Sequence, residues 1–76
     1  MSEEVITCIT EEIIYTNDDN GYTVMEASYA DGSDYFTAVG ILPCISVGQY
    51  LKLYGTWTAH PDYGDQFKIE HFEAVM

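Results

Sequence analysis

Residues 54–67 carry the strongest fold signal in the chain and read Tyr54-Gly55-Thr56-Trp57-Thr58-Ala59-His60-Pro61-Asp62-Tyr63-Gly64-Asp65-Gln66-Phe67. The aromatic and β-branched residues at both ends are typical of strands. Pro61 fixes its own φ and holds the preceding His60 extended, while Gly64 supplies the flexibility for the return. We therefore interpret this stretch as a strand, a tight turn and a second strand.

The rest of the chain continues the same pattern and predicts five strands. We expect them at residues 5–15, 22–30, 35–42, 50–59 and 67–75. Gly21 follows a polar turn cluster, and Asp31-Gly32 is a signal for a tight hairpin turn. Residues 43–49 are the only place for a helical turn, and they are too few for more than one. The sequence therefore predicts an all-β chain that forms a small five-stranded barrel with little or no helix.

Side-chain alternation predicts which residues fill this barrel. The aliphatic residues that we expect to be buried are Val24, Val39, Ile9, Ile13, Leu51, Leu53 and Ile69. We also expect the rings of Tyr22, Trp57 and Phe67 to belong to the core and its corners. The first strand has apolar residues on both faces, with Val5, Ile9 and Ile13 on one and Ile6, Cys8 and Ile14 on the other. We therefore expect it to bend and to change its buried face midway.

Cys8 and Cys44 form no metal-binding motif, because the chain has no Cys-x-x-Cys pair and no histidine at ligand spacing from either cysteine. We expect both to be small buried thiols that pack as apolar residues. A disulfide between them stays open as an alternative, although a cytosolic environment disfavours it.

The charge balance argues against nucleic-acid binding by this chain alone. Thirteen acidic residues face only Lys52 and Lys68, there is no arginine, and the formal net charge is −11. Most sequence-independent affinity for DNA comes from phosphates neutralised by lysine and arginine. We therefore expect weak or no DNA binding by the isolated domain. Two interpretations of the charge remain open: a well-solvated acidic surface, or an acidic face that docks on a basic partner.

Sequence motifs for chemistry are missing. There is no Gly-x-x-x-x-Gly-Lys-Ser/Thr loop for ATP, and no serine sits in a nucleophile elbow. Glu11 and Glu12 are adjacent in a strand and point to opposite faces, so they do not form an acid/base pair. We expect no catalytic residue, cofactor or metal in this segment. No apolar run approaches the roughly 20 residues of a membrane helix, and the acidic N-terminus does not resemble a secretion signal. The expected compartment is the cytoplasm, with no membrane contact.

Four blocks at consistent spacing carry a family resemblance. They are the 54–67 stretch, Asn17-Asp18-Asp19-Asn20-Gly21-Tyr22-Thr23-Val24, Val39-Gly40-Ile41-Leu42-Pro43 and Gly48. From about Ile6 to Glu73 the chain resembles the N-terminal OB-type domain of RecD-like ATP-dependent DNA helicases, which are often labelled exodeoxyribonuclease V alpha subunit. The resemblance implies an OB fold and a single domain over residues 1–76 at the front of a longer helicase. It also implies ATP-driven unwinding in DNA repair and recombination, with ATP and magnesium bound by other domains. The implied partners are those remaining domains, with DNA contacted through the full-length protein.

An OB fold binds single strands by stacking bases on aromatic rings of its second and third strands, with loops closing over them. The positions here that match such a role are Tyr22, Tyr29 and Tyr35 on the sheet, with His60 and Tyr63 in the last loop, although we favour the core for Tyr22. Lys52 and Lys68 would be the residues of a local positive patch. Apart from Tyr22, these residues are candidate contacts for nucleic acid or for a protein partner. Three hypotheses follow: an accessory helicase module near DNA or another domain, an acidic protein–protein interaction module without direct DNA contact, and a free-standing barrel that binds a small ligand.

Overall fold

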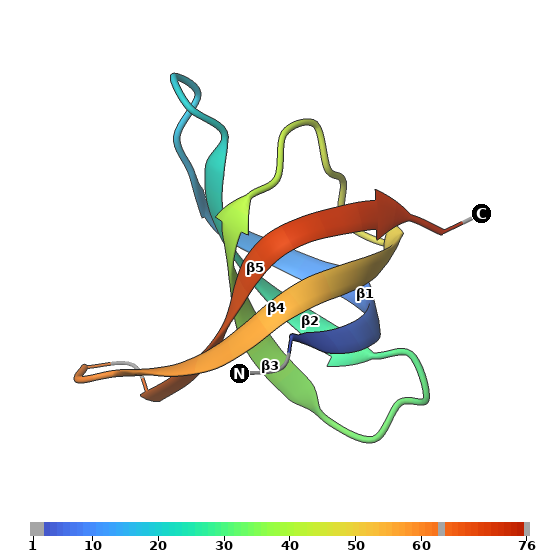
Figure 1. Cartoon of the computed structure of the whole chain (residues 1–76). Coiled ribbons are helices and arrows are strands. Elements are labelled where there is room, and N and C mark those ends of the chain that lie inside the picture. The colour runs from blue at the N-terminus through green and yellow to red at the C-terminus, as the bar shows by residue number, and fades with distance from the viewer. Residues whose placement is uncertain (1–2, 63, 76) are drawn as a thin grey trace.

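A long first strand closes the molecule by pairing with two neighbours. The computed structural model describes residues 3–62 and 64–75. Strand β1 (Glu4–Thr16) pairs with β4 (Tyr50–His60) through residues 4–9 and with β2 (Tyr22–Tyr29) through residues 8–16. Strands β3 (Tyr35–Ile41) and β5 (Gly64–Ala74) complete the sheet (Figure 1). The described residues contain no helix.

The strand order identifies the fold. The five strands form a closed barrel in the order β1-β2-β3-β5-β4. All neighbouring strands are antiparallel except β3 and β5, which pair in parallel over residues 37–39 and 66–68. This is the Greek-key barrel of an OB fold. The prediction of an all-β, five-stranded barrel is confirmed.

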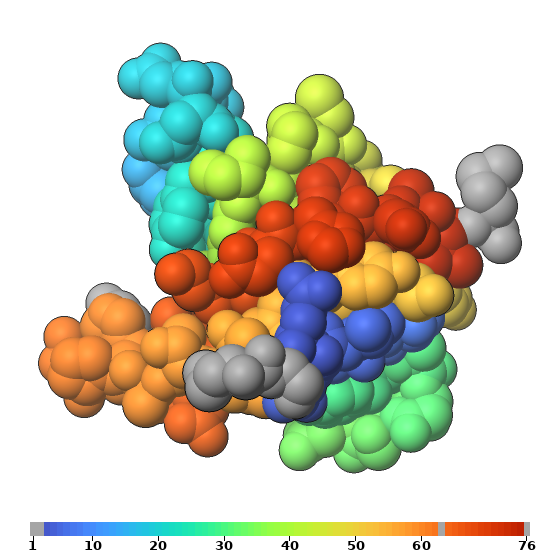
Figure 2. Space-filling model, in the orientation of Figure 1, coloured from blue at the N-terminus to red at the C-terminus, as the bar shows by residue number. Residues whose placement is uncertain are grey.

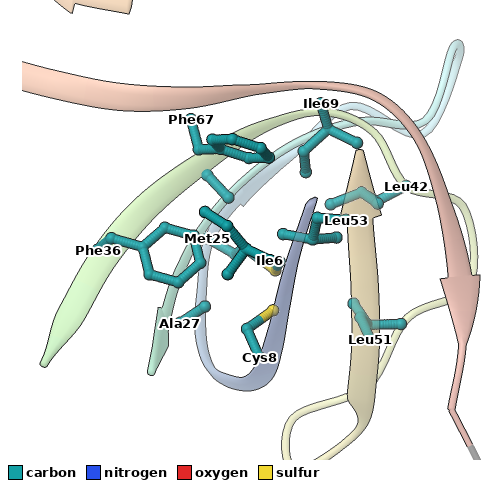
Figure 3. Packing of buried hydrophobic residues seen from close by; sticks show 11 residues of the cluster. Ile6, Cys8, Met25, Ala27, Phe36, Leu42, Leu51, Leu53, Phe67 and Ile69 are labelled. Atoms are coloured by element: carbon teal, nitrogen blue, oxygen red, sulfur yellow. The ribbon is translucent and has the colours of Figure 1, made fainter. Parts of the chain in front are cut away.

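The core fills the barrel with side chains from all five strands and from the segment after β3 (Figure 3). The buried residues of this cluster are Ile6, Cys8, Met25, Ala27, Phe36, Ala38, Leu42, Leu51, Leu53, Phe67 and Ile69. The predicted burial of Leu51, Leu53 and Ile69, of the Phe67 ring and of Val39 is confirmed. Because side chains occupy the barrel centre, a small ligand would have to bind on the outside of the barrel.

Two bulges in β1 change which of its residues face the barrel interior. Residues Ile6, Cys8 and Thr10 point inward, and the register then shifts between Thr10 and Glu12. Beyond this shift Ile13 lies opposite the buried Met25, so the predicted change of buried face occurs here, although Ile13 is only partly buried and not buried as predicted. Ile9 lies on the outer face before the bulge and is only partly buried. Sequence alternation missed this because the inward Thr10 looks like a surface residue.

Three further residues are more exposed than predicted. Val24 is half-buried and Tyr22 is exposed, because both lie on the outer face of β2. Trp57 points toward the end of the barrel, with its ring 5.2 Å from Phe67, yet it remains 37% exposed. The ring therefore covers the barrel end without being enclosed by it.

The two cysteines also differ. Both are free, so the disulfide alternative is ruled out. Cys8 is buried as predicted, and burial raises the pKa of its thiol to about 11. Cys44 is exposed, contrary to the prediction, and it adopts a left-handed backbone with φ 63° in the loop between β3 and β4.

Candidate functional site

The outer face of the barrel carries an apolar groove. Its volume is about 420 Å³, and it is lined by Ile14, Tyr15, Tyr22, Val24, Thr37, Val39, His60 and Gln66. These residues come from β1, β2, β3, β4 and β5. In the view of Figure 1 and Figure 2 the loop at residues 17–21 projects upward, and the β4–β5 hairpin extends to the lower left.

Strand register places the groove residues in two rows that cross the sheet. In the first row Tyr15 lies opposite Val24, Val24 opposite Val39, and Val39 beside Lys68. The second row runs through Glu12, Glu26, Thr37 and Gln66. Residues paired in this way project on the same side of the sheet. The groove is therefore apolar along one row, and the other row continues beyond the lining residues Thr37 and Gln66 to Glu26 and Glu12 at its β1 end.

Three apolar side chains of the groove are accessible from outside, whereas Val39, which also lines it, is buried. Ile14 is 58% exposed, Tyr15 52% and Tyr22 38%. Ile14 is the extra residue of the second bulge in β1, between Ile13 and Tyr15, which turns it outward. A gathering of exposed apolar side chains in a groove is typical of a binding site.

Both ends of the groove are held by side-chain hydrogen bonds to the backbone. The Oδ1 atom of Asn17 accepts a bond of 2.8 Å from the Asp19 N–H, which fixes the 17–21 turn and leaves the Asp19 carboxylate exposed. At the other end, His60 Nδ1 accepts a bond of 3.0 Å from the Asp62 N–H. The two loops therefore place acidic side chains near both ends of the groove.

Not all of the candidate residues lie at this groove. His60 lines it, and Lys68 adjoins it beside Val39. Tyr35 is exposed on the same outer face but outside the lining, opposite Ser28. Tyr63 lies outside the described residues.

Tyr29 is separated from the groove. Its ring centroid lies 4.8 Å from that of Phe36, at the barrel end, where the ring lines a second hollow of about 320 Å³. Burial raises the pKa of its hydroxyl, and the carboxylates of Asp34, Glu4 and Asp31 raise it further. The Tyr29 ring is therefore packed against the core and surrounded by acids, which is a poor place for a base with its phosphate.

Lys52 belongs to another face. Its ammonium lies 5.7 Å from the Tyr54 ring centroid, and that ring stacks on His71 at 4.2 Å. Both lysines and both histidines of the chain lie on the β4–β5 hairpin. The basic side chains are thus gathered on one hairpin, and only Lys68 and His60 are near the groove.

The sequence reasoning missed the main groove residues. Ile14, Tyr15 and Val24 were assigned to the core or not assigned at all, and for Tyr22 the core was favoured over a stacking role. The available signal was the run Ile13-Ile14-Tyr15, since three consecutive apolar residues in a strand cannot all face inward.

Within residues 3–62 and 64–75, no group of three or more His, Cys, Asp or Glu side chains is arranged to hold a metal ion. The described part of the chain also has no helix that could cross a membrane.

The comparisons with known proteins agree with the fold. No solved structure matches the chain. A family model described as the OB-fold domain of ATP-dependent DNA helicase YrrC matches residues 3–76, which confirms the resemblance to RecD-like helicases. The chain belongs to this family of helicase OB-fold domains.

Proposed function

We propose that this domain is an accessory, non-catalytic module of a RecD-like ATP-dependent DNA helicase that acts in DNA repair and recombination in the cytoplasm. Its task is to contact the remaining domains of the same helicase chain through the groove. ATP and magnesium are used by those domains, and DNA is contacted through the full-length protein. The single observation that carries this proposal is an accessible apolar groove with acidic flanks on the outside of a domain of the YrrC family.

The surroundings of the groove favour protein over DNA. Lys68 is the only lysine beside it, whereas Glu12 and Glu26 extend one of its rows. Phosphates brought onto this face would meet net negative charge, and lower salt would strengthen the repulsion. Stacking on Tyr15 or Tyr22 would return roughly 1–3 kcal/mol per base, which opposes but does not remove this repulsion.

A titration with DNA tests the first half of the proposal. A fluorescein-labelled single-stranded oligonucleotide is titrated with the domain at low and at physiological salt, and anisotropy is measured. We expect no binding with a Kd below about 1 μM, because too few phosphates can be neutralised. A tighter Kd that weakens with added salt, and that is lost in Lys68→Ala, would contradict the proposal.

Binding to the remaining helicase domains tests the second half of the proposal, that the groove is the docking face. Calorimetry measures binding of the domain to the remaining helicase domains, expressed separately. Tyr15→Ser should weaken binding by about tenfold or more, because burial of one large ring contributes at least about 1.4 kcal/mol. Tyr50→Ser is the matched control, since Tyr50 is 48% exposed, close to Tyr15, but lies outside the groove. Equal losses in the two variants would show that the groove is not the docking face.

A second candidate is an acidic module that binds a separate basic protein and never contacts DNA. The exposed Asp18 and Asp19 at the groove's end favour it. If the remaining helicase domains do not bind while a separate basic protein does, and Tyr15→Ser abolishes that binding, this candidate replaces the first.

A further inference from the structure

We infer that the groove recognises an extended polypeptide segment with an apolar residue and an arginine or lysine two positions apart. The apolar side chain would lie on Tyr15, Val24 and Val39, and the cation would lie between Glu12 and Glu26. This inference rests on the proposed function, because it specifies the chemistry of the partner that the groove binds.

The acidic pair, Glu12 and Glu26, carries the first part of the argument. The two residues are directly opposite each other on β1 and β2. Like charges in this position destabilise a sheet. In the described part of the chain, neither carboxylate makes a hydrogen bond or an ion pair. The domain therefore holds a repulsion on its surface that a single cation placed between the two carboxylates would relieve.

A neighbouring acid shows that this arrangement is specific to the pair. Glu11 is the extra residue of the first bulge, and its Oε2 accepts a 2.6 Å hydrogen bond from the Ser28 hydroxyl. Ser28 is itself buried. Glu11 thus has a partner within the domain, whereas Glu12 has none among residues 3–62 and 64–75.

Strand geometry sets the spacing of the ligand. Val24 and Glu26 are two residues apart on β2 and point to the same side, as Val39 and Thr37 do on β3. Such residues are separated by about 6.6 Å along a strand. An extended segment that runs along β2 has the same repeat, so an apolar side chain over Val24 places the side chain two positions away over Glu26. A nucleic acid would place phosphates there instead, which the carboxylates repel.

Peptides test this chemistry directly. The labelled probe is a short capped peptide with Leu-Ser-Arg at its centre, and the comparison peptides carry Leu-Ser-Glu or Ser-Ser-Arg. Binding is followed by amide chemical shifts of the labelled domain. We expect the Leu-Ser-Arg peptide to bind at least about tenfold more tightly than either comparison peptide, because each lacks one of the two matched contacts. The shifts should centre on residues of β1, β2 and β3 that line the groove.

Variants test the acidic pair itself. Glu12→Gln with Glu26→Gln should reduce binding of the Leu-Ser-Arg peptide by about tenfold and leave the Leu-Ser-Arg and Leu-Ser-Glu peptides with similar affinities, because the variant has no carboxylate pair to tell the two charges apart. The matched control is Glu73→Gln, because Glu73 lies opposite Lys52 on another face and should leave peptide binding unchanged. The double variant should also unfold at a higher urea concentration than the wild type, since it removes the repulsion.

The outcomes separate this inference from the proposed function. Equal affinities of the domain for the Leu-Ser-Arg and Leu-Ser-Glu peptides would overturn the inference. A double variant that is no more stable than the wild type would also overturn it. If the domain nevertheless docks on the remaining helicase domains through Tyr15, the proposed function stands. If the peptides bind with the expected preferences but the domain does not bind the remaining helicase domains, the inference is supported and the helicase itself is ruled out as the partner.

Discussion

Replacing Gly55 by alanine should be among the most damaging small changes in this domain. Gly55 is buried on β4 next to the bulge that β5 makes opposite it. A Cβ atom at this position would overlap the carbonyl oxygen of Lys68 and would lie 2.9 Å from its carbonyl carbon and 3.1 Å from Ile69 Cα. Carbon atoms in ordinary contact are about 3.5–4.0 Å apart. All three obstacles are backbone atoms, so rotating a side chain cannot relieve the overlap.

The magnitude follows from what must move. To make room, β5 has to shift away from β4, which weakens the hydrogen-bonded ladder and displaces the buried Ile69. Overpacking alone costs about 1–3 kcal/mol, and each hydrogen bond left unmade adds about 1 kcal/mol. Alanine also lowers the conformational entropy of the unfolded chain, which offsets about 0.4–1 kcal/mol of this cost. We expect a net loss of about 3 kcal/mol, a large part of the roughly 4–11 kcal/mol that a domain of this size has.

Urea unfolding followed by Trp57 fluorescence and far-ultraviolet circular dichroism measures this loss. Gly32→Ala is the control: nothing lies within 4 Å of a Cβ there, but φ is +77°, so only backbone strain of about 1–2 kcal/mol applies. The reasoning would be refuted if Gly55→Ala were no more destabilising than Gly32→Ala at equal slopes.

Three further predictions concern the core and the thiols. Phe67→Ala should cost about 3–5 kcal/mol because the ring is completely buried, whereas Trp57→Ala should cost about 2 kcal/mol because its ring is 37% exposed; the reverse order in urea unfolding would contradict the packing described. A thiol reagent at pH 8 should modify Cys44 within minutes and Cys8 only on unfolding, since Cys8 is buried and its pKa is about 11; equal rates would refute this. Because folding raises the Cys8 pKa from 9.0 to about 11, folding favours the protonated thiol. The stability that this contributes is complete below about pH 9 and is lost as the pH rises toward 11. Unfolding of Cys8→Ala should lack this part of the alkaline decline, and an identical decline in both proteins would count against it.

Turn chemistry made the strand arrangement predictable. Gly21, Gly32 and Gly64 each adopt a positive φ at a corner of the chain, and each was visible in the sequence as a break between apolar runs. The two bulges of β1 were not predictable in the same way. Their position depends on which residues of β2 and β4 lie opposite, and pairing partners leave no local mark on a single strand. That is why Ile9, which precedes the first bulge, was grouped on one face with Ile13, which follows it.

The groove was harder to predict than the fold. His60 and Lys68 were identified because polar residues in or near a turn stand out. Tyr15 was not identified, and the core was favoured for Tyr22, because an outward aromatic ring and a core ring look identical in sequence. Only the β1 bulges and the register of β2 decide which way each ring points.

The double pairing of β1 also has a consequence for how the chain acquires its structure. Residues 8–16 find their partners on β2, a few residues further along, while residues 4–9 must wait for β4. During synthesis, the first half of β1 therefore presents an unsatisfied edge until residue 55 has been made. Such an edge pairs readily with other chains. The distant closures β1–β4 and β3–β5 place the domain with topologies that fold on the order of milliseconds to seconds, so the interval before closure is the stage most exposed to aggregation.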